Sequence, residues 1–315
     1  MAKSLAIAPA VGSDWLRLFD SPDQWKNCRS QLSMLQVSYQ SLWNEASVPW
    51  FNDNIWPNVQ AAGVVDKCQK WSIDFGFYMG VWKPQYLTSA QLAVVHARQC
   101  CDNLFNAGAF STIIDLDEPF YDAKFLGVTD LATAAGRVAD FYGDLKTIYG
   151  DRVGVALTEP YPPPALTCDE IIDSMAHLMG LGVTLEWFDI DVNHVWVNQN
   201  PVRLAQMEVD LPRLADWLKA ADIPFGIIFW PGLEKRTTNQ MYCEGVLPWV
   251  DQVAAMTGLE TPGRLVSESW IFTDENRTQK ALPTNLPESE RYTHTWLIRE
   301  IAERFGWGQS TLRGA

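Results

Sequence analysis

The sequence has few of the side chains that bind nucleic acid, membranes or catalytic metals. Among its 315 residues are only four histidines, and 38 acidic side chains outnumber 24 basic ones, giving a net charge of −14. This charge repels nucleic-acid phosphates and anionic lipid surfaces at long range. No apolar run approaches the roughly 20 residues that cross a bilayer, and the first residues are a poor secretory signal. We therefore expect no nucleic acid and no membrane as partners, and a protein that is cytoplasmic or secreted with its signal absent from this chain.

Short motifs of several common enzyme classes are missing as well. The six cysteines form no CxxC pair and no Cys/His cluster, so we expect free thiols and neither a zinc site nor a redox motif. There is no HxH on the first predicted strand, no GxSxG, no GxGxxG after a strand and no GxxxxGK[ST]. These absences disfavour binuclear amidohydrolases, serine hydrolases, dinucleotide-binding proteins and P-loop proteins, and we predict no cofactor.

The chain does contain a regular alternation of short apolar segments with helical stretches. Such alternation implies parallel strands joined by right-handed helical crossovers, and eight repeats favour a closed barrel over an open sheet. Hydrophobic residues make up 47% of the chain, enough for one large core. We predict a single (β/α)8 barrel domain over residues 1–315, with long βα loops. The predicted strands are Leu5–Ala10, Met34–Tyr39, Ile73–Trp82, Thr112–Asp117, Val153–Glu159, Thr184–Asp191, Phe225–Trp230 and Leu265–Trp270.

Four of these strands end in carboxylates. Alternate residues of a barrel strand point into the lumen, and the C-terminal ones reach the pocket where barrel active sites lie. The fourth strand places Asp115 and Asp117 on one face, with Glu118 starting the loop, and the fifth ends at Glu159. Carboxylates from several strands should therefore meet in one site.

The sixth and eighth strands add acidic residues next to tryptophans. Trp187, Asp189 and Asp191 share a face of the sixth strand, and Glu268 and Trp270 share a face of the eighth. Two carboxylic acids across a pocket can divide the work of cleaving a glycosidic bond, one as general acid and the other as nucleophile or base. This pattern favours a glycoside hydrolase.

The segments Asp117-Glu118-Pro119 and Thr158-Glu159-Pro160 resemble the Asn-Glu-Pro motif of clan A glycoside hydrolases, with the Asn replaced. In that clan the motif supplies the acid/base Glu, and the nucleophile Glu follows three strands later. The resemblance implies Glu159 and Glu268 as the catalytic pair, because Glu268 lies three predicted strands after Glu159. Glu118 is a third catalytic candidate, as the acid or as the carboxylate that tunes the other two.

Fifteen tryptophans suit a carbohydrate cleft, because the apolar face of a sugar stacks on an aromatic ring. We predict a carbohydrate substrate and expect Trp270, next to Glu268 on its face, to form a floor for a sugar ring. The residues predicted to bind the substrate are Asp117, Asp189, Asp191, His194, Trp82, Trp187, Trp230 and Trp270.

Two other functions remain open. One is a sugar isomerase or epimerase: barrels similar to xylose isomerase and tagatose epimerase bind a divalent metal with Glu, Asp, His and Glu. Three of these four ligand segments resemble Glu159, the segment 191–194 and Glu268 of this chain. The fourth ligand should be His, but Trp230 stands at that position. The second open function is that of a barrel that binds carbohydrate without catalysing a reaction. Lys83, after the third strand, could form a Schiff base as in barrel aldolases, but it starts a loop and a solvated lysine is the favoured interpretation.

Overall fold

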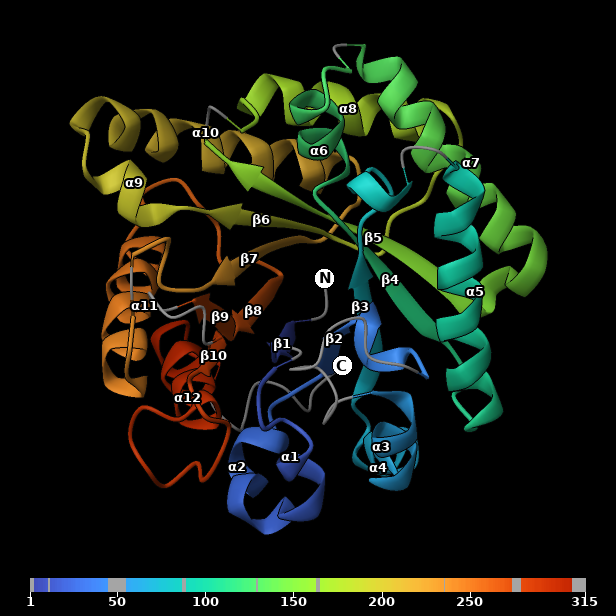
Figure 1. Ribbon diagram of the computed structural model, residues 1–315. Coiled ribbons are helices and arrows are strands. Elements are labelled where there is room, and N and C mark those ends of the chain that lie inside the picture. Colours follow the sequence, from blue (N-terminus) through green and yellow to red (C-terminus); the bar gives the residue numbers. More distant parts are fainter. Residues whose placement is uncertain are drawn as a thin grey trace.

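The computed structural model describes residues 3–10, 12–44, 55–86, 89–128, 130–162, 165–234, 236–273 and 279–307. It is a closed barrel of eight parallel strands in sequence order, which confirms the predicted fold class (Figure 1). Strand β8 closes the barrel by pairing with β1, from Ser4 opposite Arg264 to Ala8 opposite Glu268. The barrel strands are β1 (Ser4–Ala8), β2 (Met34–Ser38), β3 (Asp74–Met79), β4 (Thr112–Asp117), β5 (Val153–Tyr161), β6 (Phe188–Val192), β7 (Phe225–Phe229) and β8 (Arg264–Glu268).

The helices lie around the outside of the strands (Figure 1). Their apolar faces cover the outward-facing strand residues, which gives the main hydrophobic core. The α-helices are α1 (Arg17–Asp20), α2 (Lys26–Arg29), α3 (Trp56–Ala61), α4 (Val64–Trp71), α5 (Ala90–Asn106), α6 (Pro119–Phe125), α7 (Leu131–Tyr149), α8 (Cys168–Gly180), α9 (His194–Asn198), α10 (Pro201–Ala220), α11 (Asn239–Ala254) and α12 (His294–Arg304).

Local sequence signals explain several helix starts. The Asp130 carboxylate accepts the N–H groups of Ala132 and Thr133 at the start of α7. Thr167 and Glu170 form a capping box at the start of α8, with each side chain bonded to the other's backbone N–H. These side chains satisfy N–H groups that have no partner within the helix, which fixes where the two helices begin.

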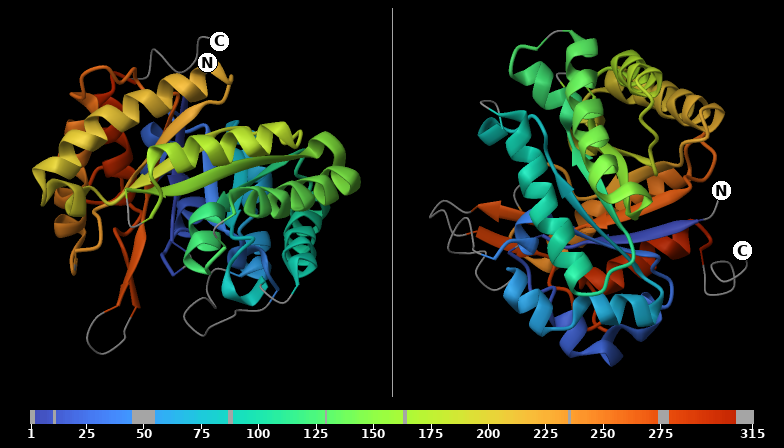
Figure 2. Two further views of the ribbon diagram at one scale, coloured as in Figure 1. Left: turned by 90° about the horizontal axis from the view of Figure 1, so that it is seen from above. Right: turned by 90° about the vertical axis from the view of Figure 1, so that its right-hand side faces the viewer.

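Several predicted strand ends differ from those in the structure. The third strand ends at Met79 instead of Trp82, and the sixth begins at Phe188 instead of Thr184. Strand β8 ends at Glu268, and Trp270 begins a hairpin of β9 (Trp270–Thr273) with β10 (Gln279–Leu282). Both views in Figure 2 show this hairpin extending beyond the end of the barrel. Trp270 therefore stands on the hairpin, two residues past the end of the barrel strand.

Inside the barrel, a second and smaller apolar cluster meets buried polar groups. It includes Ala6, Ala156, Ile228 and Val266, which come from four different strands. Gly226 lacks a side chain at a point where a Cβ atom would collide with the Asp189 carboxylate. The lumen is therefore filled by side chains, and a cavity opens toward the C-terminal ends of the strands.

The structure also bears on the cysteines and on membrane insertion. All six cysteines are buried free thiols, as the sequence predicts. In the described ranges, no helix combines the length and apolarity needed to span a bilayer.

Candidate functional site

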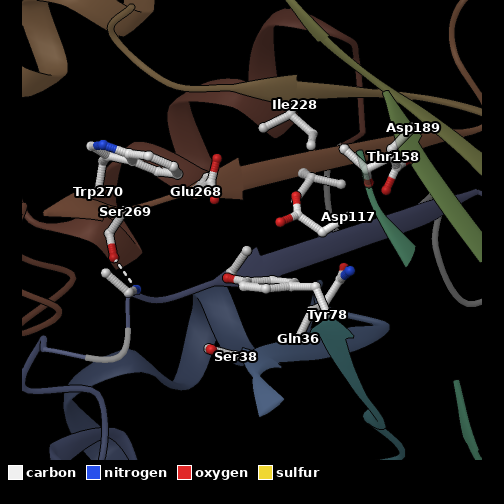
Figure 3. A pocket seen from close by; sticks show the side chains of 13 residues that line it. Gln36, Ser38, Tyr78, Asp117, Thr158, Asp189, Ile228, Glu268, Ser269 and Trp270 are labelled. Carbon is white, nitrogen blue, oxygen red and sulfur yellow. Dashed lines mark hydrogen bonds between the residues drawn. The ribbon is translucent and has the colours of Figure 1, made fainter. Parts of the chain in front are cut away.

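A cavity of about 350 Å³ lies at the C-terminal ends of the strands (Figure 3). It combines carboxylates, hydroxyl groups and an aromatic wall, and none of the described residues that line it is Lys or Arg. This composition resembles that of small-molecule sites, where a few polar groups converge in a mostly apolar pocket. The residues that line it include Gln36, Ser38, Tyr78, Asp117, Thr158, Asp189, Ile228, Val266, Glu268, Ser269 and Trp270.

The floor of the cavity is a connected polar network. Arg264 and Asp189 form an ion pair with an N–O distance of 2.9 Å, and both side chains are only 1% exposed. Arg264 also donates to the Gln36 amide oxygen at 2.5 Å, and the Gln36 amide nitrogen donates to Asp115 at 2.6 Å. Thr158 donates to the other Asp115 oxygen at 3.0 Å. Because each polar group is partnered, these buried charges fix the floor in one arrangement.

The predicted residues Asp189 and Trp187 thus lie in the floor and not at the mouth. The Arg264 guanidinium stacks on the Trp187 ring, 4.0 Å from its centre, and the Trp187 N–H donates to Asp115 at 3.3 Å. Burial and the nearby Asp189 raise the pKa of Asp115 to about 7, although Arg264 lowers it.

Trp270 is the aromatic wall of the cavity, and the Trp230 ring packs against it without lining the cavity itself. Their ring centres are 5.7 Å apart with a tilt of 38°. Trp230 is buried and its indole N–H donates to Asp191, whereas Trp270 is 41% exposed and faces the cavity. Burial raises the pKa of Asp191 to about 7, opposed by this hydrogen bond. An exposed tryptophan at a cavity mouth is available to stack on a ligand.

Glu268 and Asp117 reach the cavity from opposite sides of the barrel. They end β8 and β4, which are separated by three strands in each direction around the closed sheet, and Figure 3 shows both facing the same space. Glu268 lies among Ile228, Val266 and Trp270, and within the described residues its carboxyl group makes no hydrogen bond. Burial, followed by the charges of Asp191 and Asp117, raises the pKa of Glu268 well above its ordinary value.

Lys83 holds three carboxylates at the edge of the cavity. Its ammonium nitrogen lies 3.1 Å from Asp117, 3.3 Å from Glu118 and 3.0 Å from Asp122. Lys83 is only 24% exposed, so the solvated lysine expected from the sequence is wrong. Its own pKa is raised by the three carboxylates despite burial, which keeps it charged and unsuited to forming a Schiff base. Burial and Asp117 raise the pKa of Glu118 to about 8, although Lys83 lowers it.

Glu159, one of the two residues predicted as the catalytic pair, faces away from the cavity. Its carboxylate accepts the backbone N–H groups of Phe120 and Tyr121, at 2.7 and 3.1 Å, in the first turn of α6. Thr158, its neighbour, lines the cavity instead. Side chains alternate along a strand, so Glu159 belongs to the helix-facing side of β5 and the structure does not bring it together with Glu268.

Trp82 and His194, predicted to bind the substrate, lie away from the cavity. Trp82 is buried in the outer core, with the Arg137 guanidinium 4.3 Å from its ring centre. The His194 ring is buried against the Trp249 ring at 5.6 Å, and one of its ring nitrogens hydrogen-bonds the Gly245 carbonyl at 3.1 Å. Both are part of the packing between strands and helices.

The metal ligands expected for a sugar isomerase are not assembled. Glu159 is directed to α6 and His194 to α11, so only Asp191 and Glu268 of that set remain near the cavity. Among the residues that the structure describes, no group of three or more His, Cys, Asp or Glu side chains is arranged to hold a metal ion.

Several lining residues were not singled out from the sequence, although part of the signal was there. Gln36 and Ser38 alternate with Leu35 and Val37 on β2, and Tyr78 alternates with Phe77 on β3. Residues two apart in a strand lie on the same face, so polar residues that alternate with buried apolar ones indicate the lumen face of a barrel strand. The position of Lys83 had no such signal, because it depends on the path of a loop.

Comparisons with known proteins identify the fold but no family. No protein-family model and no curated protein matches this sequence. Two similar solved structures are xylanases. One is a thermostable mutant from Cellvibrio japonicus (TM-score 0.55, 11% identity, covering 97% of this chain and 98% of that one). The other, from Paenibacillus barcinonensis, has a TM-score of 0.55 and 10% identity over 94% of this chain and 95% of that one.

A D-psicose 3-epimerase crystallised with D-fructose is also similar, with a TM-score of 0.50 and 8% identity over 99% of this chain and 100% of that one. At these identities the likeness concerns the fold alone. This chain shares its barrel fold with xylanases, which are glycoside hydrolases, and with enzymes of other classes such as this epimerase.

Proposed function

We propose that the protein hydrolyses a glycosidic bond in the cavity at the C-terminal face of the barrel. The observation that carries this proposal is the different surroundings of Glu268 and Asp117, which share one cavity. Within the part of the chain that the structure describes, Glu268 has no cation paired with it and its pKa is raised, whereas Asp117 lies 3.1 Å from the Lys83 ammonium. Glycosidic cleavage requires two carboxyl groups in different protonation states.

Each group then has a definite part in the reaction. Glu268, whose pKa is raised by burial, donates its proton to the glycosidic oxygen as the bond to the leaving group breaks. Water then adds to the anomeric carbon and gives a proton back to the Glu268 carboxylate. Asp117, paired with Lys83, supplies the carboxylate that stabilises the positive charge developing at the anomeric carbon. Glu118, next to Asp117 and 3.3 Å from the Lys83 ammonium, helps to hold Lys83 at the edge of the cavity.

The remaining lining fits a sugar ring. The hydroxyl groups of Ser38, Tyr78 and Ser269 offer partners for sugar hydroxyls, and Trp270 offers an apolar face. The barrel fold shared with xylanases supports the same class of substrate but does not identify the sugar.

A substrate screen tests the proposal. The protein is incubated with nitrophenyl glycosides and with neutral oligosaccharides, after dialysis against EDTA, and new reducing ends are measured. We expect release from at least one of them, unchanged by the chelator. Binding without release across the whole panel would overturn hydrolysis and favour a carbohydrate-binding barrel. Isomerised sugar that appears only when Mn²⁺ is restored would favour the isomerase.

Replacing Trp270 by Ala is expected to weaken substrate binding and turnover together. The loss should amount to roughly 1–3 kcal/mol in kcat/KM, the range for removing contact with a large apolar side chain. Because Trp270 is 41% exposed, the melting temperature should change little. Trp249→Ala is the matched control, since Trp249 is fully buried and should lower the melting temperature. Unchanged saccharide kinetics in Trp270→Ala would contradict a role for this ring.

A further inference from the structure

The two Glu-Pro segments, 117–119 and 158–160, lie side by side in the barrel. Asp117 pairs with Thr158 in the β4–β5 register, and the Glu118 N–H donates to the Thr158 carbonyl at 2.8 Å. Glu118 and Glu159 consequently start from neighbouring points, but Glu159 faces α6 and Glu118 faces Lys83. The pairing of the two segments brings one carboxylate to each side of the turn that begins α6.

On the helix side, Glu159 satisfies the first turn of α6. Pro119 has no N–H, and the Asp122 N–H donates to the Glu118 carbonyl at 2.9 Å. The N–H groups of Phe120 and Tyr121 remain, and the Glu159 carboxylate accepts both. With Glu159 in place, the backbone donors of this turn are partnered in a buried environment.

The backbone at Glu118 needs such support. Its φ angle is 55°, in the left-handed region that non-glycine residues rarely occupy. A residue in this region keeps its conformation only when the surrounding structure holds it there, and such residues concentrate at functional sites. Here the conformation lets β4 end at Asp117 and α6 begin directly after Glu118.

On the cavity side, Lys83 contacts the same turn through Asp117, Glu118 and Asp122. Its side chain lies over Gly80, where an added Cβ would collide with the Lys83 carbon chain. The loop after β3 is therefore shaped to deliver this ammonium group to the end of β4.

We propose that Glu159 and Lys83 are positioning residues that hold the Asp117-Glu118 turn from its two sides, so that Asp117 stays directed at the cavity. This inference rests on the proposed function for its catalytic consequence. It assigns no contact with substrate to Glu159, and it explains why a buried carboxylate lies on the outer face of β5. Lys83 fixes the position of the Asp117 carboxylate and, among the described residues, supplies the only cation in contact with it.

Two kinds of variant separate these roles. Lys83→Met removes the charge that lowers the Glu118 pKa, so that pKa should rise above about 8. Lys83→Arg keeps the charge and should leave the Glu118 titration near that of the wild type. Glu159→Gln keeps one acceptor but sets an amide N–H₂ group against a backbone N–H, which should displace the turn.

The experiment measures the Glu118 carboxyl titration by NMR in protein labelled with ¹³C-glutamate, together with kcat and KM across pH. For both Lys83→Met and Glu159→Gln we expect kcat to fall about tenfold or more with little change in KM, because small displacements of reacting groups are costly. Only Lys83→Met should raise the Glu118 pKa. Lys124→Met is the matched control. Lys124 lies on α6, the helix that begins at this turn, but its ammonium group pairs with Glu170 at 2.7 Å.

The outcomes distinguish this inference from the proposed function. An unchanged Glu118 titration in Lys83→Met would overturn the role of Lys83, whether or not hydrolysis is ever found. Wild-type kcat in Glu159→Gln would overturn the role of Glu159, provided that Glu268→Gln is inactive. If Glu159→Gln does not fold, Glu159→Asp, which shortens the side chain by one carbon, takes its place. A variant that lowers only the melting temperature indicates a purely structural residue and also contradicts the proposal.

Discussion

Glu268→Gln is expected to lower kcat by about 10²- to 10⁴-fold, the contribution usual for a general acid. The substitution keeps the shape of the side chain and removes the proton that the glycosidic oxygen would accept. Since the Glu268 carboxyl makes no hydrogen bond within the described residues, the substitution removes no hydrogen bond of the described fold. The melting temperature should therefore stay near that of the wild type. Initial rates and thermal unfolding of the same preparation measure both effects.

The pH profile gives an independent check on Glu268. Its pKa is raised by burial and by neighbouring carboxylates, so the acid form persists above the pH at which an ordinary Glu titrates, about 4.3. Activity should be lost as the pH rises through this raised pKa, and Glu268→Gln should lack that alkaline limb.

Glu288→Gln is the matched control for Glu268→Gln. Glu288 is also a buried carboxylate, but it accepts backbone N–H groups of Asn27 and Cys28 and lies outside the cavity lining. Its replacement should lower stability and spare kcat. Wild-type activity in Glu268→Gln would remove Glu268 from the mechanism.

The barrel was predictable because its pattern is repeated along the whole chain. Each strand must be apolar on its helix-facing side, and each helix must present an apolar face to the sheet. The strand pattern and the helix pattern of apolar residues therefore recur in every βα unit. Strand ends were less predictable. The boundary after Glu268 arises because Trp270 leaves the barrel and pairs with Leu282 in a hairpin, a contact between residues that are distant in the sequence.

The site was predictable only where the face of the strand was considered. Glu268 is in phase with Val266, which lies in the lumen, whereas Glu159 is in phase with Val155 and Leu157, which lie in the outer core. That alternation already indicates that Glu159 points to the helices. The similarity of the two Glu-Pro segments concealed it, because a short motif does not specify a direction.

The partners of the charged groups could not be inferred from the sequence. Whether Lys83 is solvated or held by three carboxylates depends on how one loop crosses the end of β4. The same holds for His194, whose environment is set by the packing of α11. Such contacts join residues far apart in the chain, and no local pattern records them.

Arg264→Met is expected to cost about 3–5 kcal/mol of unfolding free energy, the usual penalty for leaving one member of a buried ion pair alone. Asp189 would remain about 1% exposed without its cation, and the Gln36 amide oxygen would lose its donor. Methionine fills much of the same volume, so the loss should reflect charge and hydrogen bonding more than a cavity. Urea unfolding measures it as a lower midpoint with an unchanged slope.

A second substitution tests the cause of this loss. Asp189→Asn in the Arg264→Met background removes the unpaired charge and should restore part of the stability. The single variant should also lose stability as the pH rises, because burial raises the pKa of Asp189 and the native state then favours its protonated form. Lys219→Met, which breaks an exposed ion pair with Glu260, is the surface control and should change little. If the double variant is no more stable than Arg264→Met, packing around the guanidinium, and not its charge, holds the floor of the cavity together.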